Sequence, residues 1–168
     1  MACYSYCIMA TLYSQTTSNT SSNFNWNANT DNYAWSFVPS VSWTPWTLTI
    51  NVGSITWTPT CDFWIKWDKT AASATYWTAS WITLSAGDNN ITLTSGALLT
   101  AWVTYWVYMA RTSNTSNTPN ITYDTWKSNY VVYRSTSSWV DPSTLWFSND
   151  IRMTITSTPN TGGFFLFF

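Results

Sequence analysis

The carboxylate side chains that could perform acid–base chemistry in this chain are seven aspartates, because the sequence contains neither histidine nor glutamate. Without histidine, no Ser–His or Cys–His pair can activate a nucleophile. A glycosidase needs two carboxyl groups that face each other across a cleft. Asp62 and Asp68 are close in sequence, but Asp62 falls on an expected strand and Asp68 in a turn. The sequence therefore predicts no catalytic residue and a protein that is not an enzyme, with a hydrolase ranked last.

Residues that could bind a metal ion follow no known spacing. The three cysteines, Cys3, Cys7 and Cys61, form no zinc motif, and their odd number defines no disulfide framework. Cys61 begins an expected strand and is predicted to be buried, with Cys3 and Cys7 as thiols of a short tail. Two oxygen-rich turns, at residues 88–90 and 149–150, carry the ligand types that calcium prefers. We expect no cofactor, with a structural calcium ion as the alternative.

Aromatic and polar side chains with outward parity on the expected strands could bind a sugar. A pyranose ring stacks its apolar C–H face on a flat aromatic ring, and exposed aromatic groups on a sheet face usually signal binding. The predicted ligand site consists of Trp64, Trp106, Tyr108, Tyr133, Asp62, Lys66 and Arg152, with Asn51 sharing the outward parity. Phe63, Trp67 and Tyr105 have inward parity and are predicted to be core. The alternatives are that loops cover these rings, or that Trp64 and Trp106 are glycines.

The elements that must position these residues are short strands. The central one, residues 98–109, alternates strictly, with Val103, Tyr105, Val107 and Met109 on one face. Further strands are expected at 33–38, 47–53, 60–67, 75–84, 90–94, 130–134 and 150–157. About eight short alternating strands without a helical pattern predict an all-β antiparallel sandwich, with a jelly roll favoured.

The expected domain organisation has three parts. Residues 1–30 are predicted to be a flexible polar arm, residues 31–158 the β-sandwich, and residues 159–168 a Gly/Phe-rich tail. The tail has three interpretations: it inserts into a neighbouring subunit by strand addition, it docks on its own sandwich, or the reading frame is truncated.

The composition limits the classes of partner that we expect for this protein. Only 8% of residues are charged and the net charge is −1, which predicts no nucleic-acid partner. No stretch approaches the ~20 apolar residues of a membrane span. Ser, Thr and Asn make up about 40% of the chain, far from average composition. This bias suits an extracellular, cell-surface or virion protein, whose turns and exposed strand faces use these residues.

Tryptophan occupies positions where turns normally use glycine. The chain has 14 Trp and 5 Gly, an inverted ratio. Trp43, Trp46 and Trp57 lie in segments that otherwise have the composition of turns, and Trp102 directly precedes a strand. One hypothesis is that many of these codons are UGA, read as glycine in the source organism. The alternative is a Trp-rich binding protein.

The order of segments resembles a family of bacterial and phage surface domains, the jelly-roll sandwiches similar to choice-of-anchor and carbohydrate-binding modules. The resemblance covers residues 31–158 and rests on Ser36-Phe37, on the segment 57–60 followed by 63–66, and on the segment 99–105. The family pattern has glycine where this chain has Trp57 and Trp102, and recoding would remove both departures.

The resemblance implies extracellular display and carries over no defined binding residue. We therefore expect a non-catalytic adhesion or glycan-binding module of a bacterial surface or phage tail or virion assembly. Its partners would be a glycan or cell-surface polysaccharide and other subunits of the assembly. The alternative is a self-assembling structural subunit of a surface or virion fibre.

Overall fold

The chain is described by a computed structural model that covers residues 9–18, 20–23, 32–55, 60–70, 75–94, 96–112, 119–125, 132–135, 144–147 and 150–157. Within these ranges the secondary structure consists of thirteen β-strands in two sheets. All pairings between the strands are antiparallel. No helix in this part of the chain is long and apolar enough to cross a membrane.

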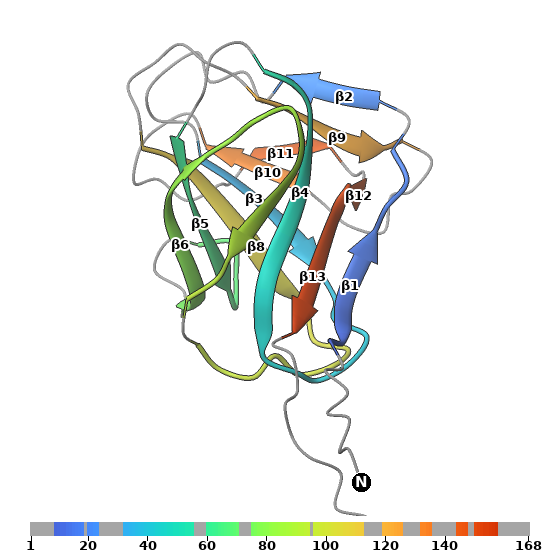
Figure 1. Cartoon of the computed structure of the whole chain (residues 1–168), viewed down its shortest axis with the longest axis vertical. Helices are drawn as coiled ribbons and strands as arrows, with labels where there is room; N and C mark the ends of the chain where they lie inside the picture. Colours follow the sequence, from blue (N-terminus) through green and yellow to red (C-terminus); the bar gives the residue numbers. More distant parts are fainter. Residues whose placement is uncertain are drawn as a thin grey trace, which may run out of the picture.

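The first sheet has seven strands, with β4 as its longest element. Its order is β1-β13-β4-β9-β12, with β7 also paired to β4 and β2 to β9. The strands are β1 (Thr11–Gln15), β2 (Thr20–Asn23), β4 (Pro45–Ile55), β7 (Gly87–Thr92), β9 (Pro119–Asp124), β12 (Asp150–Ile151) and β13 (Met153–Ser157). Figure 1 shows β4 and β13 running down the front of the molecule.

The second sheet has six strands and lies behind the first in Figure 1. Its order is β11-β10-β3-β8-β5-β6. The strands are β3 (Asn32–Phe37), β5 (Thr60–Lys66), β6 (Thr75–Thr83), β8 (Tyr105–Arg111), β10 (Val132–Ser135) and β11 (Thr144–Phe147). Two antiparallel sheets that pack face to face confirm the predicted β-sandwich. The jelly-roll connectivity remains a prediction.

More strands form than the eight that hydrophobic alternation predicts. The additional ones are β1, β2, β9 and β11, and the expected strand 150–157 is divided into β12 and β13 at Arg152. Strands β1 and β2 lie within residues 1–30, the expected arm, and pair with β13 and β9 of the first sheet. The segment is polar in composition, yet Leu12 and Tyr13 are buried. The tail 159–168, Cys3, Cys7 and Trp57 lie outside the described residues.

The core lies between the two sheets and follows the predicted parity. Leu48, Ile50 and Val52 of β4 and Ile155 of the neighbouring β13 are fully buried. The inward residues of the facing sheet are buried as well, among them Cys61, Phe63, Ile65, Val107 and Met109. Cys61 is buried, as the sequence predicts. Trp35 of β3 spans the core, because its indole N–H donates to the sulfur of Met153 on β13 at 3.1 Å. This contact joins the second sheet to the first.

The outer face of the second sheet is buried where β3 and β8 pair. All six residues of β3 are buried, although Ala34 and Ser36 point away from the core. Tyr108 of β8 pairs with Ala34 and is 4% exposed. Strand β3 is therefore buried on both faces, and this burial of the outer face limits which of the predicted binding residues can reach a ligand.

Candidate functional site

The predicted binding residues lie on both outer faces of the sandwich. Asp62, Trp64 and Lys66 are on β5, and Trp106 and Tyr108 are on β8 of the second sheet. Arg152 lies between β12 and β13 of the first sheet. Tyr133 is on β10, where its backbone pairs with Ala34, and its side chain lies outside the described residues. One site cannot combine these groups, because the two sheets separate them.

The aromatic group on the second sheet is a packed cluster. Trp64 and Tyr108 are directly opposite each other in the ladder, with ring centroids 5.5 Å apart and an edge-to-face angle of 77°. The Lys66 ammonium lies 4.9 Å from the centre of the Tyr108 ring and 5.9 Å from that of Trp64, within cation–π range. Lys66 is 6% exposed and Tyr108 is 4% exposed. The expected open platform is therefore not formed at Tyr108 and Lys66.

The other second-sheet residues have different environments from those expected. Trp64 and Trp106 are half-buried. Asp62 accepts a hydrogen bond from the backbone N–H of Trp81 at 2.7 Å and so holds an irregular part of β6.

The prediction of Trp67 as core is wrong, because it is 53% exposed. Strand β5 ends at Lys66, and the register shifts after Ile65, so the alternation stops before Trp67.

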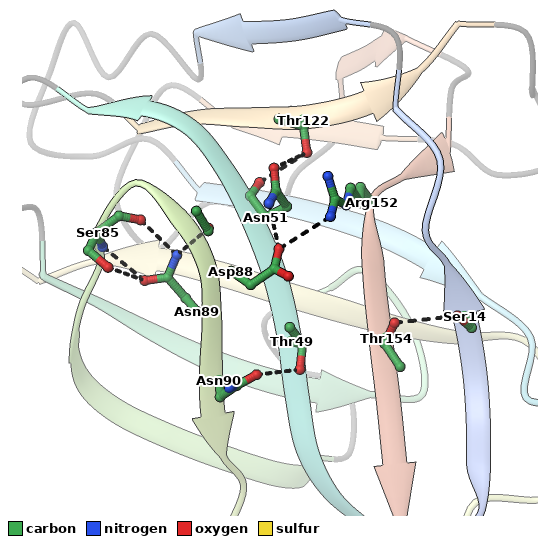
Figure 2. Close-up of polar contacts among 11 residues, drawn as sticks. Ser14, Thr49, Asn51, Ser85, Asp88, Asn89, Asn90, Thr122, Arg152 and Thr154 are labelled. Atoms are coloured by element: carbon green, nitrogen blue, oxygen red, sulfur yellow. Dashed lines mark hydrogen bonds and ion pairs between the residues drawn. The ribbon is translucent and has the colours of Figure 1, made fainter.

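A polar hollow lies on the outer face of the first sheet around Arg152. It is lined by Gln15, Thr16, Thr49, Asn51, Asp88, Arg152, Met153 and Thr154. These residues come from β1 and the residue after it, β4, β7 and the segment that includes the start of β13. In Figure 2 Asn51, Asp88 and Arg152 point toward one another from neighbouring parts of this face. The hollow unites one predicted site residue with side chains from three further elements.

A chain of polar contacts orders the hollow. Thr122 on β9 donates its hydroxyl to the side-chain oxygen of Asn51 at 2.8 Å. The Asn51 amide donates to Asp88 Oδ1, and the Arg152 guanidinium lies 3.6 Å from the same oxygen. The side chains of Asp88 and Arg152 remain 54% and 35% exposed. The Asp88–Arg152 pair is thus fixed on the protein side and accessible on the solvent side.

The turn that precedes β7 fixes the position of Asp88. Asn89 is buried, accepts the backbone N–H of Ser85 at 2.8 Å, and donates its amide to the carbonyl groups of Ser85 and Gly87 at 2.8 and 3.0 Å. Asn90 accepts a hydrogen bond from Thr49 on the adjacent strand at 2.8 Å. Asp88, Asn89 and Asn90 therefore bind three different sets of partners, and their oxygens do not converge on one ion.

The second turn with ligand types for calcium contains a buried aspartate, Asp150. Asp150 is 2% exposed and lies opposite Asp124 of β9, which accepts the Thr17 hydroxyl at 2.7 Å. Asn149 lies outside the described residues. Within the described ranges, no group of three or more Cys, His, Asp or Glu side chains could hold a metal ion.

The hollow offers mixed hydrogen-bonding chemistry. Arg152 supplies donors in a planar fork, Asp88 supplies acceptors, and Asn51, Gln15 and Thr49 supply both. The lining contains one carboxylate, whereas glycoside hydrolysis uses a pair. The lining therefore presents both donors and acceptors to a polar ligand.

Sequence reasoning found Arg152 and Asn51 by their outward parity but did not connect them with Asp88. The connection depends on register, because Asn51 lies directly opposite Asp88 in the β4–β7 ladder. The turn composition around residue 88 is visible in the sequence, but the partner strand of β7 is not.

Comparison with protein-family models finds no match to this chain, and a search of curated proteins finds no match either.

Proposed function

We propose that the protein is a non-catalytic extracellular module that binds a glycan of a cell surface, as part of a bacterial surface or phage tail or virion assembly. The observation that carries this proposal is the hollow at Asp88 and Arg152, where charged and amide groups are ordered by the protein and remain accessible. Carbohydrate hydroxyl groups both donate and accept, which matches this set of side chains. The Ser/Thr/Asn-rich composition and the nearly neutral charge also favour an extracellular setting.

The packed aromatic cluster on the second sheet is less suited to bind a sugar than the hollow is. Its Lys66 and Tyr108 are buried, and the rings of Trp64 and Tyr108 contact each other edge to face. We therefore place the glycan at the hollow, where Arg152 and Asn51 are the residues that outward parity also indicates.

We expect Asp88→Ala to lower the affinity for a bound oligosaccharide by roughly 10- to 100-fold, because it removes charge-assisted hydrogen bonds and the partner that orients Arg152. Isothermal titration calorimetry against a panel of oligosaccharides, including fragments of bacterial surface polysaccharides, measures this loss. Thr92→Ala is the matched control, because Thr92 is exposed on the same strand and outside the hollow. If no oligosaccharide binds, or if both variants lose affinity equally, the proposal is wrong.

A second candidate function is a self-assembling structural subunit. The observation in its favour is an apolar end of the sandwich, where two loops are hydrogen-bonded together. Trp102 N–H donates to the Pro39 carbonyl at 2.9 Å, and Ala101 N–H to the Ser42 hydroxyl at 2.8 Å. Three exposed apolar residues, Val41, Leu98 and Trp102, belong to these loops.

Removal of residues 164–168 tests the form of this second function in which the tail makes the contact, because a subunit that reaches its neighbour through the tail loses oligomers when the tail is removed. We expect the full chain to form oligomers and the shortened chain to be a monomer with unchanged circular dichroism, if assembly is the function. Sedimentation velocity of both chains measures the result. An unchanged oligomeric state rejects this role for the tail.

A further inference from the structure

Two tryptophans have a backbone conformation that L-amino acids with large side chains rarely adopt. Among the described residues, the non-glycine residues with positive φ are Trp81, at 59°, and Trp102, at 65°. This left-handed region places the Cβ atom too close to the following carbonyl oxygen, and glycine avoids the conflict because it has no Cβ. For a bulky residue such a φ is an outlier that requires a cause.

The surroundings impose this conformation at position 102. Trp102 N–H donates to the Pro39 carbonyl, and Thr100 N–H donates to the Tyr105 hydroxyl at 3.0 Å. Three residues before Trp102, Leu99 exchanges two backbone hydrogen bonds with Trp43, of 3.1 and 3.0 Å. Backbone contacts therefore fix the turn on both sides. The indole contributes little to this arrangement, because Trp102 is 79% exposed.

At position 81 a β-bulge imposes the left-handed conformation. The β5–β6 register passes from Cys61↔Ile82 to Phe63↔Ala79, so that Ser80 and Trp81 together oppose Asp62 in a bulge. Asp62 accepts the N–H of Trp81 and holds the bulge in place. One class of bulge requires a left-handed residue, which is normally glycine. Trp81 is 71% exposed, so its side chain also gains little from burial.

We infer that positions 81 and 102 are occupied by glycine in the protein as its source organism makes it, each through a UGA codon decoded as glycine. The inverted ratio of 14 Trp to 5 Gly has the direction that such decoding produces. The rival explanation, a pair of strained aromatic residues that bind a ligand, needs the indole rings themselves. Trp35 is the contrasting case: it is 1% exposed, donates to Met153 and lies in a regular strand, so it is a true tryptophan.

Glycine at these positions affects one of the two candidate functions. Glycine at position 102 removes the largest exposed apolar side chain from the end that would support assembly. The hollow is unaffected, since no tryptophan lines it. The inference therefore stands or falls independently of glycan binding at Asp88.

Peptide mass spectrometry of the protein from its native source tests the inference directly. We expect peptides that contain residues 81 and 102 to carry glycine, and the peptide that contains residue 35 to carry tryptophan. The corresponding codons are expected to be UGA at 81 and 102 and UGG at 35. Tryptophan in the native protein at either 81 or 102 overturns the inference.

A second measurement uses the chain with tryptophan at every such position, made in a standard host. We expect Trp102→Gly to raise the melting temperature by roughly 2–4 °C over Trp102→Ala, because alanine keeps the Cβ that opposes a positive φ. Trp81→Gly and Trp81→Ala form the same pair at the bulge. Trp35→Gly is the control and is expected to lower the melting temperature. A glycine variant no more stable than its alanine counterpart at either position contradicts the inference.

Discussion

Gly96→Ala is expected to destabilise the fold by about 3 kcal/mol, at the upper end of the cost of overpacking. A Cβ at this position would lie 1.5 Å from the carbonyl oxygen of Tyr76 and 2.8 Å from the Trp77 ring. The first contact is with backbone, so no side-chain rotation can relieve it. The segment is held against β6 on both sides, by Thr94 N–H to the Thr78 carbonyl at 2.8 Å and by Trp77 Nε1–H to the Ala97 carbonyl at 3.0 Å.

The Gly96 variant should therefore detach this segment from the edge of the second sheet. Thermal unfolding should show a melting temperature lowered by roughly 6–12 °C, given the size of the chain. Gly87→Ala is the matched control, because a Cβ there meets no atom within 4 Å and only the φ of 95° opposes it. Its expected cost is smaller, about 1–2 kcal/mol. If Gly87→Ala proves the more damaging change, the close approach at Gly96 is not a determinant of stability.

Period-2 alternation was sufficient to predict the sandwich and most of its core. The inward residues of β4, Leu48, Ile50 and Val52, could be assigned without a structure because each is apolar and its neighbours are polar. The polar strands were not predicted, as β1 and β2 show. Their sequences have few apolar residues, and their place in the sheet comes from pairing with β13 and β9. Pairing energy of this kind depends on the partner strand and leaves little trace in the local pattern.

The candidate site was harder to predict than the core, for two physical reasons. Parity identifies the face of a sheet to which a side chain points, but not whether that face is covered, and Tyr108 and Lys66 are outward yet buried. Register decides which outward residues meet, and the contact between Asn51 and Asp88 depends on the antiparallel pairing of β4 with β7. Neither cover nor register between distant strands follows from local sequence.

The sequence indicated one of the two tryptophans whose backbone is unusual. It also pointed to Trp43 and Trp46, which do not have a positive φ. Trp102 was noted because it directly precedes a strand and stands where the similar domains have glycine, and the structure gives it a positive φ. Trp81 was not marked, since it lies within an alternating strand. The bulge opposite Asp62 that requires its conformation is a property of the β5–β6 pair.

Trp35→Ala is expected to cost about 3–5 kcal/mol, the range for removal of a large aromatic side chain from a core. Trp35 is the largest fully buried side chain among the described residues, and its N–H to Met153 is a direct polar contact between the sheets. Its deletion leaves a cavity between two sheets whose backbones are each fixed by their own ladders, so the surroundings can collapse only in part. Urea unfolding followed by circular dichroism measures the loss.

Trp35→Phe separates the two contributions of this residue. Phenylalanine keeps most of the aromatic volume but cannot donate to the Met153 sulfur, so we expect an intermediate loss of about 1–2 kcal/mol. Met153→Leu then provides the reciprocal test, because it removes the acceptor while it conserves volume. If the double variant loses as much stability as the sum of the two single variants, the N–H to sulfur contact contributes nothing of its own. A loss clearly smaller than that sum shows that the contact couples the two sheets, and that the indole at position 35 is used for its nitrogen as well as its size.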